Sequence, residues 1–397
     1  MPTLTFTGLL VVGVVAVAVP LLLELVPSLP LPSLVLEIVG GIVVGPAVLG
    51  WVHVDAPVQV VSDLGLGMLL FMAGFEIDPQ RLRGRLMSLS VAGYAGSVAL
   101  GILAGYLLFA GSLVLTPILI AIPLMSTSLG ALIPLLKDAG QTDTDFGQLV
   151  ITAGTIAEFV PVVLLSLLFS LTSESPAGEL LLLGGFGLVV AAAAVALTRA
   201  VRADWLTAVL RRLDDTSSQL RVRLAIVLAL AFAVAAEQFG LAMILGAFMA
   251  GVILRVLGQY EPDVQPVFRI KLESIAFGFL VPVFFVATGV ELDIGALVNP
   301  GTMAKVPVFL AAMLLVRGLP ALAYRTLLPQ RLVLSAGLLQ ATTLTMPIVV
   351  VQLGIELGRL TSGTGAALLT ASLLSVVLFP RLGLSLLRAP RADAVPA

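Results

Sequence analysis

The sequence predicts an all-α, polytopic membrane protein. Of its 397 residues, 59% are hydrophobic and only 11% are charged, and the mean hydropathy is +1.15. An average soluble domain is about 25% charged, so this composition is typical of a chain that lies in a bilayer. The hydrophobic runs are roughly 20 residues long, which suits helices that cross a ~30 Å hydrocarbon core and not the short alternating strands of a barrel.

Hydrophobic runs separated by short polar segments predict about thirteen transmembrane helices. Three of them differ in character: 32–50 and 241–257 are short and rich in Gly, and 273–290 contains Pro282. The candidate spans are residues 5–26, 32–50, 58–77, 87–110, 114–136, 145–171, 178–199, 219–239, 241–257, 273–290, 301–326, 331–356 and 362–387. The lipid bilayer is therefore the first partner that we expect.

The positions of Lys and Arg predict the orientation. If the N-terminus lies outside and the spans alternate, 18 of the 21 basic residues fall on the inside. Lys305 and Arg359 fall outside, and Arg317 falls within a span. This bias matches the positive-inside rule and predicts a protein of the cell (inner or plasma) membrane with an external N-terminus and a cytoplasmic C-terminus. Residues 1–7 carry no Lys or Arg, unlike a cleavable signal peptide, so 9–26 is expected to remain as the first helix.

The chain divides into two similar halves. We expect a six-helix repeat at 1–176, a linker helix and cytoplasmic loop at 177–217, a second six-helix repeat at 218–390, and a short cytoplasmic tail at 391–397. In each half the second span is short and Gly-rich, and the fifth is interrupted by Pro and hydroxyl residues. Such paired interruptions are typical of inverted-repeat transporters with crossed, broken helices at the midplane. The plainer interpretation is two Pro-kinked helices whose free backbone groups are satisfied by hydroxyls.

The segment 120–168 contains the best candidate for a functional site. Ser126, Thr127 and Ser128 interrupt the first of its two hydrophobic runs, and Glu158 is a single carboxylate within the second. A lone charge at the bilayer centre costs roughly 3 kcal/mol on insertion scales, so it is retained for a polar neighbour or a function. We therefore predict a monovalent-cation site in which Glu158 supplies the charge and Thr127 and Ser128 supply hydroxyl oxygens.

Supporting groups are expected in the second half. The later interruption contains Thr342 and Thr343, and Arg317 is a charge within span 301–326. Arg317 has two interpretations: it pairs with Glu158 when no ion is bound, or it caps carbonyl groups at the broken helices and never meets the acid.

Composition excludes several other kinds of site. The chain has no Cys, which excludes disulfides and thiolate metal sites, and His53 is its only histidine, which excludes His clusters. The net charge is −2 without a long basic run, so we expect no nucleic-acid partner. The clustered hydroxyls have no His base near them in the sequence, so we do not expect an enzyme. No cofactor is expected beyond the transported cation and proton.

Four motifs, in order, carry a family resemblance that extends from Leu4 to about Leu387. The chain resembles the monovalent cation:proton antiporter-2 family, which includes potassium-efflux and sodium/proton exchangers. The motifs are LGLGMLLFMAGFEIDPQRLR (64–83), LIPLLKDAGQTDTDFGQLVI (132–151), GLAMILGAFMAGVIL (240–254) and FGFLVPVFFVATGVELDI (277–294).

The resemblance implies a thirteen-helix homodimer with a scaffold domain and a moving core domain. It implies that Glu158 is the ion-binding acid and that Arg317 takes the place of a membrane-embedded Lys or Arg. It also implies that the hydroxyl residues lie on two broken helices: Ser126, Thr127 and Ser128 on the first, and Thr342 and Thr343 on the second.

Two departures from the family pattern affect the expected stoichiometry. The acid is Glu158 where the family usually has Asp, and the preceding residue is Ala157 where members often have Asp, Asn or Gln. With one acid that binds either a cation or a proton, we expect electroneutral, one-for-one exchange. The chain has no strand–G-x-G-x-x-G–helix unit, so we expect no built-in nucleotide-binding regulatory domain.

These observations favour a secondary antiporter that exchanges Na⁺ or K⁺ for H⁺ by an alternating-access, elevator-like mechanism. An organic-anion carrier on a similar inverted-repeat fold is one alternative, with Arg317 as the counter-ion, although Glu158 would repel its substrate. A membrane sensor that does not transport is another, and it predicts that Glu158→Gln folds without an ion-dependent phenotype. The residues do not distinguish Na⁺, Li⁺ and K⁺.

Overall fold

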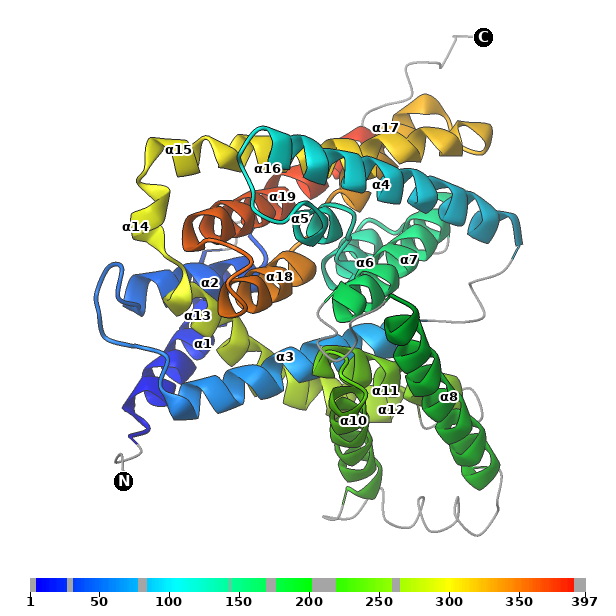
Figure 1. Ribbon diagram of the computed structural model, residues 1–397, viewed down its shortest axis with the longest axis horizontal. Coiled ribbons are helices and arrows are strands. Elements are labelled where there is room, and N and C mark those ends of the chain that lie inside the picture. The colour runs from blue at the N-terminus through cyan, green and yellow to red at the C-terminus, as the bar shows by residue number, and fades with distance from the viewer. Residues whose placement is uncertain are drawn as a thin grey trace. The chain divides into compact units, whose positions relative to one another are not determined.

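The described part of the chain is helical. The computed structural model describes residues 5–26, 31–77, 84–142, 144–168, 176–201, 219–258 and 265–388, and no strand occurs within these ranges (Figure 1). The expected loop beyond Val201 and the expected tail at 391–397 lie outside the described residues. The helices are α1 (Thr7–Leu25), α2 (Ser33–Val44), α3 (Ala56–Glu76), α4 (Gly84–Ala110), α5 (Pro117–Leu124), α6 (Leu129–Asp138), α7 (Asp145–Leu168), α8 (Pro176–Val201), α10 (Leu220–Gln238), α11 (Met243–Gly258), α12 (Gln265–Ile275), the π-helix η1 (Ala276–Leu280), α13 (Val281–Glu291), α14 (Ile294–Leu297), α15 (Pro300–Met303), α16 (Lys305–Gly318), the 3₁₀-helix η2 (Leu319–Thr326), α17 (Gln330–Gln340), α18 (Thr345–Glu356) and α19 (Ser362–Arg388).

The lengths and composition of these helices support the prediction of a multi-pass membrane protein. Among the described residues, nine helical segments are long and apolar enough to cross a membrane, and three further apolar segments are shorter. Every predicted span coincides with one or more helices. The number of crossings and the inverted repeat remain predictions.

Three proline residues lie in or next to segments where the helices differ from the predicted spans. The second span was expected to reach residue 50, but α2 ends at Val44, because a residue before a proline (here Gly45, before Pro46) is disfavoured in the α conformation. The expected span 273–290 begins earlier, at Gln265, and passes through the π-helix η1, which ends two residues before Pro282. The end of span 301–326 tightens into the 3₁₀-helix η2, whose second residue is Pro320.

The helices form two compact units, and each unit takes helices from both halves of the sequence. One unit comprises residues 1–79 and 162–292, and contains α1–α3, α8 and α10–α13. The other comprises 80–161 and 293–397, and contains α4–α6, most of α7, and α14–α19. These units are defined by which helices pack together, so they do not test the division of the sequence into repeats at 1–176 and 218–390, which stays a prediction.

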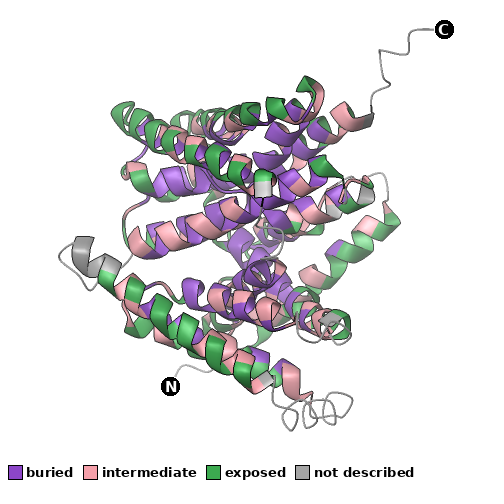
Figure 2. Ribbon diagram, turned by 90° about the vertical axis from the view of Figure 1, so that its right-hand side faces the viewer, coloured by how far each residue is buried: buried purple, intermediate pink, exposed green. Residues whose placement is uncertain are grey.

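Burial differs strongly between the helices. Figure 2 shows helices with buried and exposed residues on different sides of the ribbon. In the most apolar 18-residue stretch of each segment, 83% of the residues are buried for Gln330–Glu356 and 72% for α7, compared with 11% each for α1 and for Leu181–Ala200 of α8. The exposed residues of α1 and α8 are largely apolar, which suits contact with lipid. The two segments that contain Thr342, Thr343 and Glu158 are therefore more enclosed by protein than α1 and α8.

In the first unit, glycines allow helices from the two halves to pack closely. A Cβ at Gly41 of α2 would lie 2.0 Å from the Val286 carbonyl oxygen of α13, and one at Gly251 of α11 would lie 2.0 Å from the Phe71 carbonyl oxygen of α3. The second helix of each half thus packs on the third helix of the other half. Glycine-rich helices can pack closely within one chain or between protomers. For Gly41 and Gly251 this packing lies within one chain.

The close contact between α3 and α11 leads to a stability prediction. A Cβ at Gly74 of α3 would lie 2.1 Å from the Phe248 carbonyl oxygen, whereas one at Gly67 of the same helix has no neighbour within 4 Å. We expect Gly74→Ala to destabilise the protein by about 1–3 kcal/mol because the helices must separate. The measurement is the Tm of the purified protein in detergent. Gly67→Ala is the matched control, expected to leave Tm unchanged or slightly raised, and equal Tm values for the two variants would contradict the described contact.

Candidate functional site

The first helix interruption lies between α5 and α6. After Pro123 the helix ends, Met125 to Ser128 form a non-helical link, and α6 begins at Leu129. The Ser126 hydroxyl donates to the Pro123 carbonyl oxygen at 2.9 Å, which satisfies one of the carbonyl groups released at the helix end. The predicted interruption therefore occurs at the residues that the sequence indicates.

The second interruption lies between α17 and α18. Pro347 has no N–H, so it cannot supply the helical hydrogen bond that the Thr343 carbonyl would otherwise accept. The Oγ of Ser375, on α19, lies 3.0 Å from that carbonyl oxygen and accepts a hydrogen bond from the Thr343 N–H at 3.2 Å. The break is thus stabilised by a serine that is 32 residues further along the chain.

The two interruptions are hydrogen-bonded to each other. The Ser128 N–H donates to the Thr342 carbonyl oxygen at 3.0 Å, and the Ser128 Oγ accepts from the Leu344 N–H at 3.0 Å. The hydroxyls of Ser126 and Thr343 are 2.6 Å apart. Helix ends leave backbone groups without intrahelical partners, and here each broken helix supplies partners for the other. All the predicted hydroxyl residues of both interruptions are buried.

Arg317 holds this crossing through a hydroxyl. Its Nε donates to the Thr127 Oγ1 at 2.9 Å, and Thr127 in turn donates to the Gln340 carbonyl oxygen at 2.5 Å. Its Nη1 donates to the Ser97 Oγ at 2.8 Å, and its guanidinium carbon lies 5.4 Å from the centre of the Tyr94 ring. The side chain is 1% exposed. Arg317 therefore acts on a carbonyl of the second interruption indirectly, and its pairing with Glu158 remains a prediction.

Glu158 lies beside the first interruption because of a proline on its own helix. Pro161 lacks an N–H, so the carbonyl of Ala157 has no helical donor four residues later. The Thr127 N–H donates to that carbonyl oxygen at 3.2 Å. The non-helical link thus binds α7 at the residue next to Glu158, whose side chain is only 4% exposed. This contact joins the buried acid to the hydroxyl-rich segment.

Sequence reasoning missed several residues that support the crossing. Ser97 and Tyr94 contact Arg317, and Tyr324 pairs with the Gln340 side chain, with the Gln340 Nε2 donating to the Tyr324 Oη at 3.2 Å. A readable signal existed on α4, because Ser90, Tyr94 and Ser97 recur at intervals of four and three residues and so share one helix face. No comparable pattern marks Gln340, whose role depends on a contact distant in the sequence.

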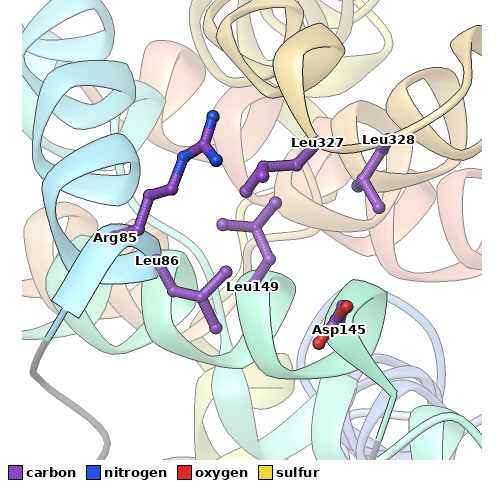
Figure 3. Close-up of a pocket in the computed structure, with 6 residues that line it drawn as sticks. All are labelled: Arg85, Leu86, Asp145, Leu149, Leu327 and Leu328. Atoms are coloured by element: carbon purple, nitrogen blue, oxygen red, sulfur yellow. The ribbon is translucent and has the colours of Figure 1, made fainter.

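A small surface pocket lies elsewhere in the same unit. It has a volume of about 130 Å³ and is lined by the start of α4, the first turns of α7 and the two residues that follow η2 (Figure 3). Arg85 and Asp145 are its charged residues, and the remaining lining residues are leucines. None of the predicted site residues lines this pocket.

Comparison with known families identifies the chain's relatives. Residues 13–385 match the family described as sodium/hydrogen exchanger, transmembrane. The chain belongs to this family. The match covers nearly all of the sequence, and it confirms the resemblance to a family of monovalent cation:proton antiporters that the four motifs indicate.

Individual members of the exchanger family are similar at moderate identity. YjbQ of Bacillus subtilis is 27% identical in an alignment of 389 positions that covers 94% of this chain and 62% of YjbQ. The chain thus spans less than two thirds of that relative's length. The Na(+)/H(+)-K(+) antiporter GerN of Bacillus cereus is 28% identical over 68% of this chain and 67% of GerN. The glutathione-regulated potassium-efflux system protein KefC of Klebsiella pneumoniae is 27% identical over 74% of this chain and 46% of KefC.

The fold of this family member also matches a solved structure. The sodium proton antiporter MjNhaP1 from Methanocaldococcus jannaschii superposes with a TM-score of 0.72 at 17% identity, covering 95% of this chain and 97% of that chain. At this identity the likeness shows the fold alone. It supports an all-helical antiporter-type fold for the described helices.

Proposed function

We propose that the protein is a secondary active antiporter that exchanges a monovalent cation, Na⁺ or K⁺, for H⁺. The observation that carries this proposal is the buried carboxylate of Glu158, next to the carbonyl group that binds the first helix interruption. An intramembrane carboxylate is costly unless it has a function, and a single carboxylate can hold a proton or a cation but not both. Membership of the exchanger family supports the same conclusion.

Oxygen atoms near the interruptions suit a hard cation. A Na⁺ or K⁺ ion that loses water needs other oxygen ligands in its place, and the carboxylate of Glu158 has two oxygen atoms that share a negative charge. The ends of α5 and α17 present carbonyl groups whose partial negative charge also attracts cations. The hydroxyls of Ser126, Thr127 and Ser128 hold the non-helical link beside the acid, and Thr342 and Thr343 hold the matching link of the second half.

We also propose an alternating-access, elevator-like movement between two inverted repeats. The reciprocal packing of second and third helices across the two halves supports the repeat, because a twofold relation generates such pairs. Hydrogen bonds between Ser128 and Thr342 tie both interruptions together within one unit, which favours their movement as one body. Opposite accessibility changes of paired cysteine probes in the two halves test this movement.

The sidedness and assembly follow from other arguments. The bias of basic loops supports an external N-terminus in the cell membrane, and a cysteine introduced at Arg359 should then react with an impermeant thiol reagent from outside. The family resemblance favours a homodimer, which chemical cross-linking in membranes tests.

The deciding experiment is transport in proteoliposomes. A pH gradient is imposed, internal pH is followed with a dye, and Na⁺, Li⁺ or K⁺ is added in turn. We expect cation-dependent loss of the gradient for the wild type and none for Glu158→Gln. If neither protein responds to any cation, the antiporter proposal fails, and organic anions become the next substrates to test with Arg317 as their counter-ion.

Exchange is expected to be electroneutral. Glu158 has Ala157 as its neighbour, so one acid carries either one cation or one proton in each direction. Each half-cycle then moves the same net charge, and the rate should not change when the membrane potential is clamped at different values. A transport current in solid-supported-membrane recordings would contradict one-for-one exchange while leaving the antiport itself intact.

A further inference from the structure

Polar residues follow one face of α7 up to Glu158. Asp145, Gln148, Thr152, Thr155 and Glu158 are separated by three, four, three and three residues, which places them along a single helical face. The face begins at Asp145, which lines the pocket at the start of α7 (Figure 3), and its last three residues are buried. Thr155 is therefore the polar neighbour of Glu158 one helical turn earlier.

Hydrogen bonding already occupies the hydroxyls that the sequence suggests as cation ligands. A hydroxyl has one O–H donor and two lone pairs. The Ser128 Oγ accepts from the N–H groups of Leu344 at 3.0 Å and Thr345 at 3.3 Å, so both lone pairs are used. The Thr127 Oγ1 accepts from Arg317 and donates to Gln340. Ser128 cannot bind a cation without giving up a hydrogen bond that holds the crossing. Thr127 keeps one lone pair, but the positive charge of Arg317, which donates to the same oxygen, opposes a cation there.

The Thr155 hydroxyl, unlike that of Ser128, donates a hydrogen bond but accepts none from the described residues. Its Oγ1 donates to the Ile151 carbonyl oxygen at 2.9 Å, within its own helix. No other described residue donates a hydrogen bond to this hydroxyl. Both lone pairs of its oxygen are therefore available, whereas its O–H is already used. The side chain is buried. Such a hydroxyl can only accept, which is what a cation requires of a ligand.

We propose that Thr155 is the hydroxyl ligand of the transported cation, beside the carboxylate of Glu158. The inference rests on the proposed antiport function and adds a specific oxygen to its site. In this arrangement Thr127 and Ser128 hold the helix crossing, and the uncharged side-chain ligand of the cation comes from α7. Thr155 then sets the affinity for the cation and has no part in binding the proton.

Thr152 provides a matched control on the same helix. Its Oγ1 donates to the Gln148 carbonyl oxygen at 2.8 Å, as Thr155 does to Ile151, and it is also buried. It lies six residues before Glu158 and so is a further turn away. Valine has nearly the same shape as threonine, so Thr→Val at either position removes only the hydroxyl and its hydrogen bond to the backbone carbonyl four residues earlier. The two variants therefore differ mainly in proximity to the acid.

The experiment compares wild type, Thr155→Val, Thr155→Ser, Thr152→Val and Glu158→Gln in the proteoliposome assay. We expect Thr155→Val to raise the KM for the cation about tenfold, which is about 1.4 kcal/mol, with a smaller change in maximal rate. Thr155→Ser should restore the wild-type KM, and Thr152→Val should leave it unchanged. As a second readout, added cation should raise the Tm of wild type more than that of Thr155→Val, because a ligand stabilises the state it binds.

The outcomes separate the inference from the function on which it depends. If wild type exchanges cations and Glu158→Gln does not, but Thr155→Val keeps the wild-type KM and cation-induced Tm rise, the ligand assignment is wrong and the antiporter stands. Equal KM increases in Thr155→Val and Thr152→Val would also overturn it, because they indicate a general effect on α7. Absence of cation-dependent exchange in wild type overturns both.

Discussion

Glu158→Gln is expected to abolish cation-dependent proton exchange. Glutamine has nearly the same shape as glutamate, but it carries no charge and binds no proton between the two half-cycles. Removing one charged partner of a buried ion contact costs about 3–5 kcal/mol, which corresponds to a loss of at least about 100-fold in cation affinity. The measurement is the initial rate of dye response in proteoliposomes after addition of Na⁺, Li⁺ or K⁺.

A matched variant distinguishes this effect from a general loss of carboxylate charge. Glu356 lies at the exposed end of α18, and Glu356→Gln is expected to transport like wild type. Glu158→Gln should also keep a Tm no lower than that of wild type, since a neutral amide is easier to bury than a carboxylate. A Glu158→Gln protein that folds and still exchanges cations would falsify the assignment of the site.

The second large effect is expected for Ser128→Ala. The Ser128 Oγ accepts hydrogen bonds from the N–H groups of Leu344 and Thr345, at the start of α18. Without it, two amides in the interior lose their acceptor, and an unsatisfied buried donor costs about 1–3 kcal/mol. We expect a total destabilisation of about 2–4 kcal/mol, measured as a lower Tm in detergent, together with slower transport because the two broken helices are no longer held together.

Ser126→Ala is the control within the same interruption. The Ser126 hydroxyl contacts the Pro123 carbonyl and the Thr343 hydroxyl but no backbone N–H, so its removal should cost about 1 kcal/mol. The expected order of Tm is wild type, then Ser126→Ala, then Ser128→Ala. If Ser128→Ala is as stable as wild type, the described capping of α18 by the first interruption is not important for stability.

Local chemistry explains why so much of the helical architecture could be predicted. Long apolar runs must be helical in a bilayer because every backbone group needs an internal partner. Proline acts on its own helix: Pro123 and Pro347 lie at the two breaks, as the sequence indicates, and Pro161 releases the carbonyl beside Glu158. Such effects depend on residues within one turn of the chain.

Partners of the candidate site could be predicted only in part. The sequence identified the hydroxyls of both interruptions, but it did not indicate that Ser128 caps the other broken helix or that Ser375 satisfies Thr343. It left two interpretations of Arg317, and neither included Ser97 or Tyr94. These contacts join residues far apart in the chain, and spacing within one segment carries no information about them.

The sequence by itself determined that this is a helical membrane protein with two interrupted helices and a carboxylate, Glu158, within an apolar run, because composition, hydrophobic run length and proline act locally. Only the tertiary structure decided which hydroxyl oxygen atoms already take part in hydrogen bonds. It joins Thr127 to Arg317 and Gln340, and leaves the lone pairs of Thr155 available beside Glu158. The physical reason is that a hydroxyl's free capacity depends on all its neighbours, which packing alone brings together.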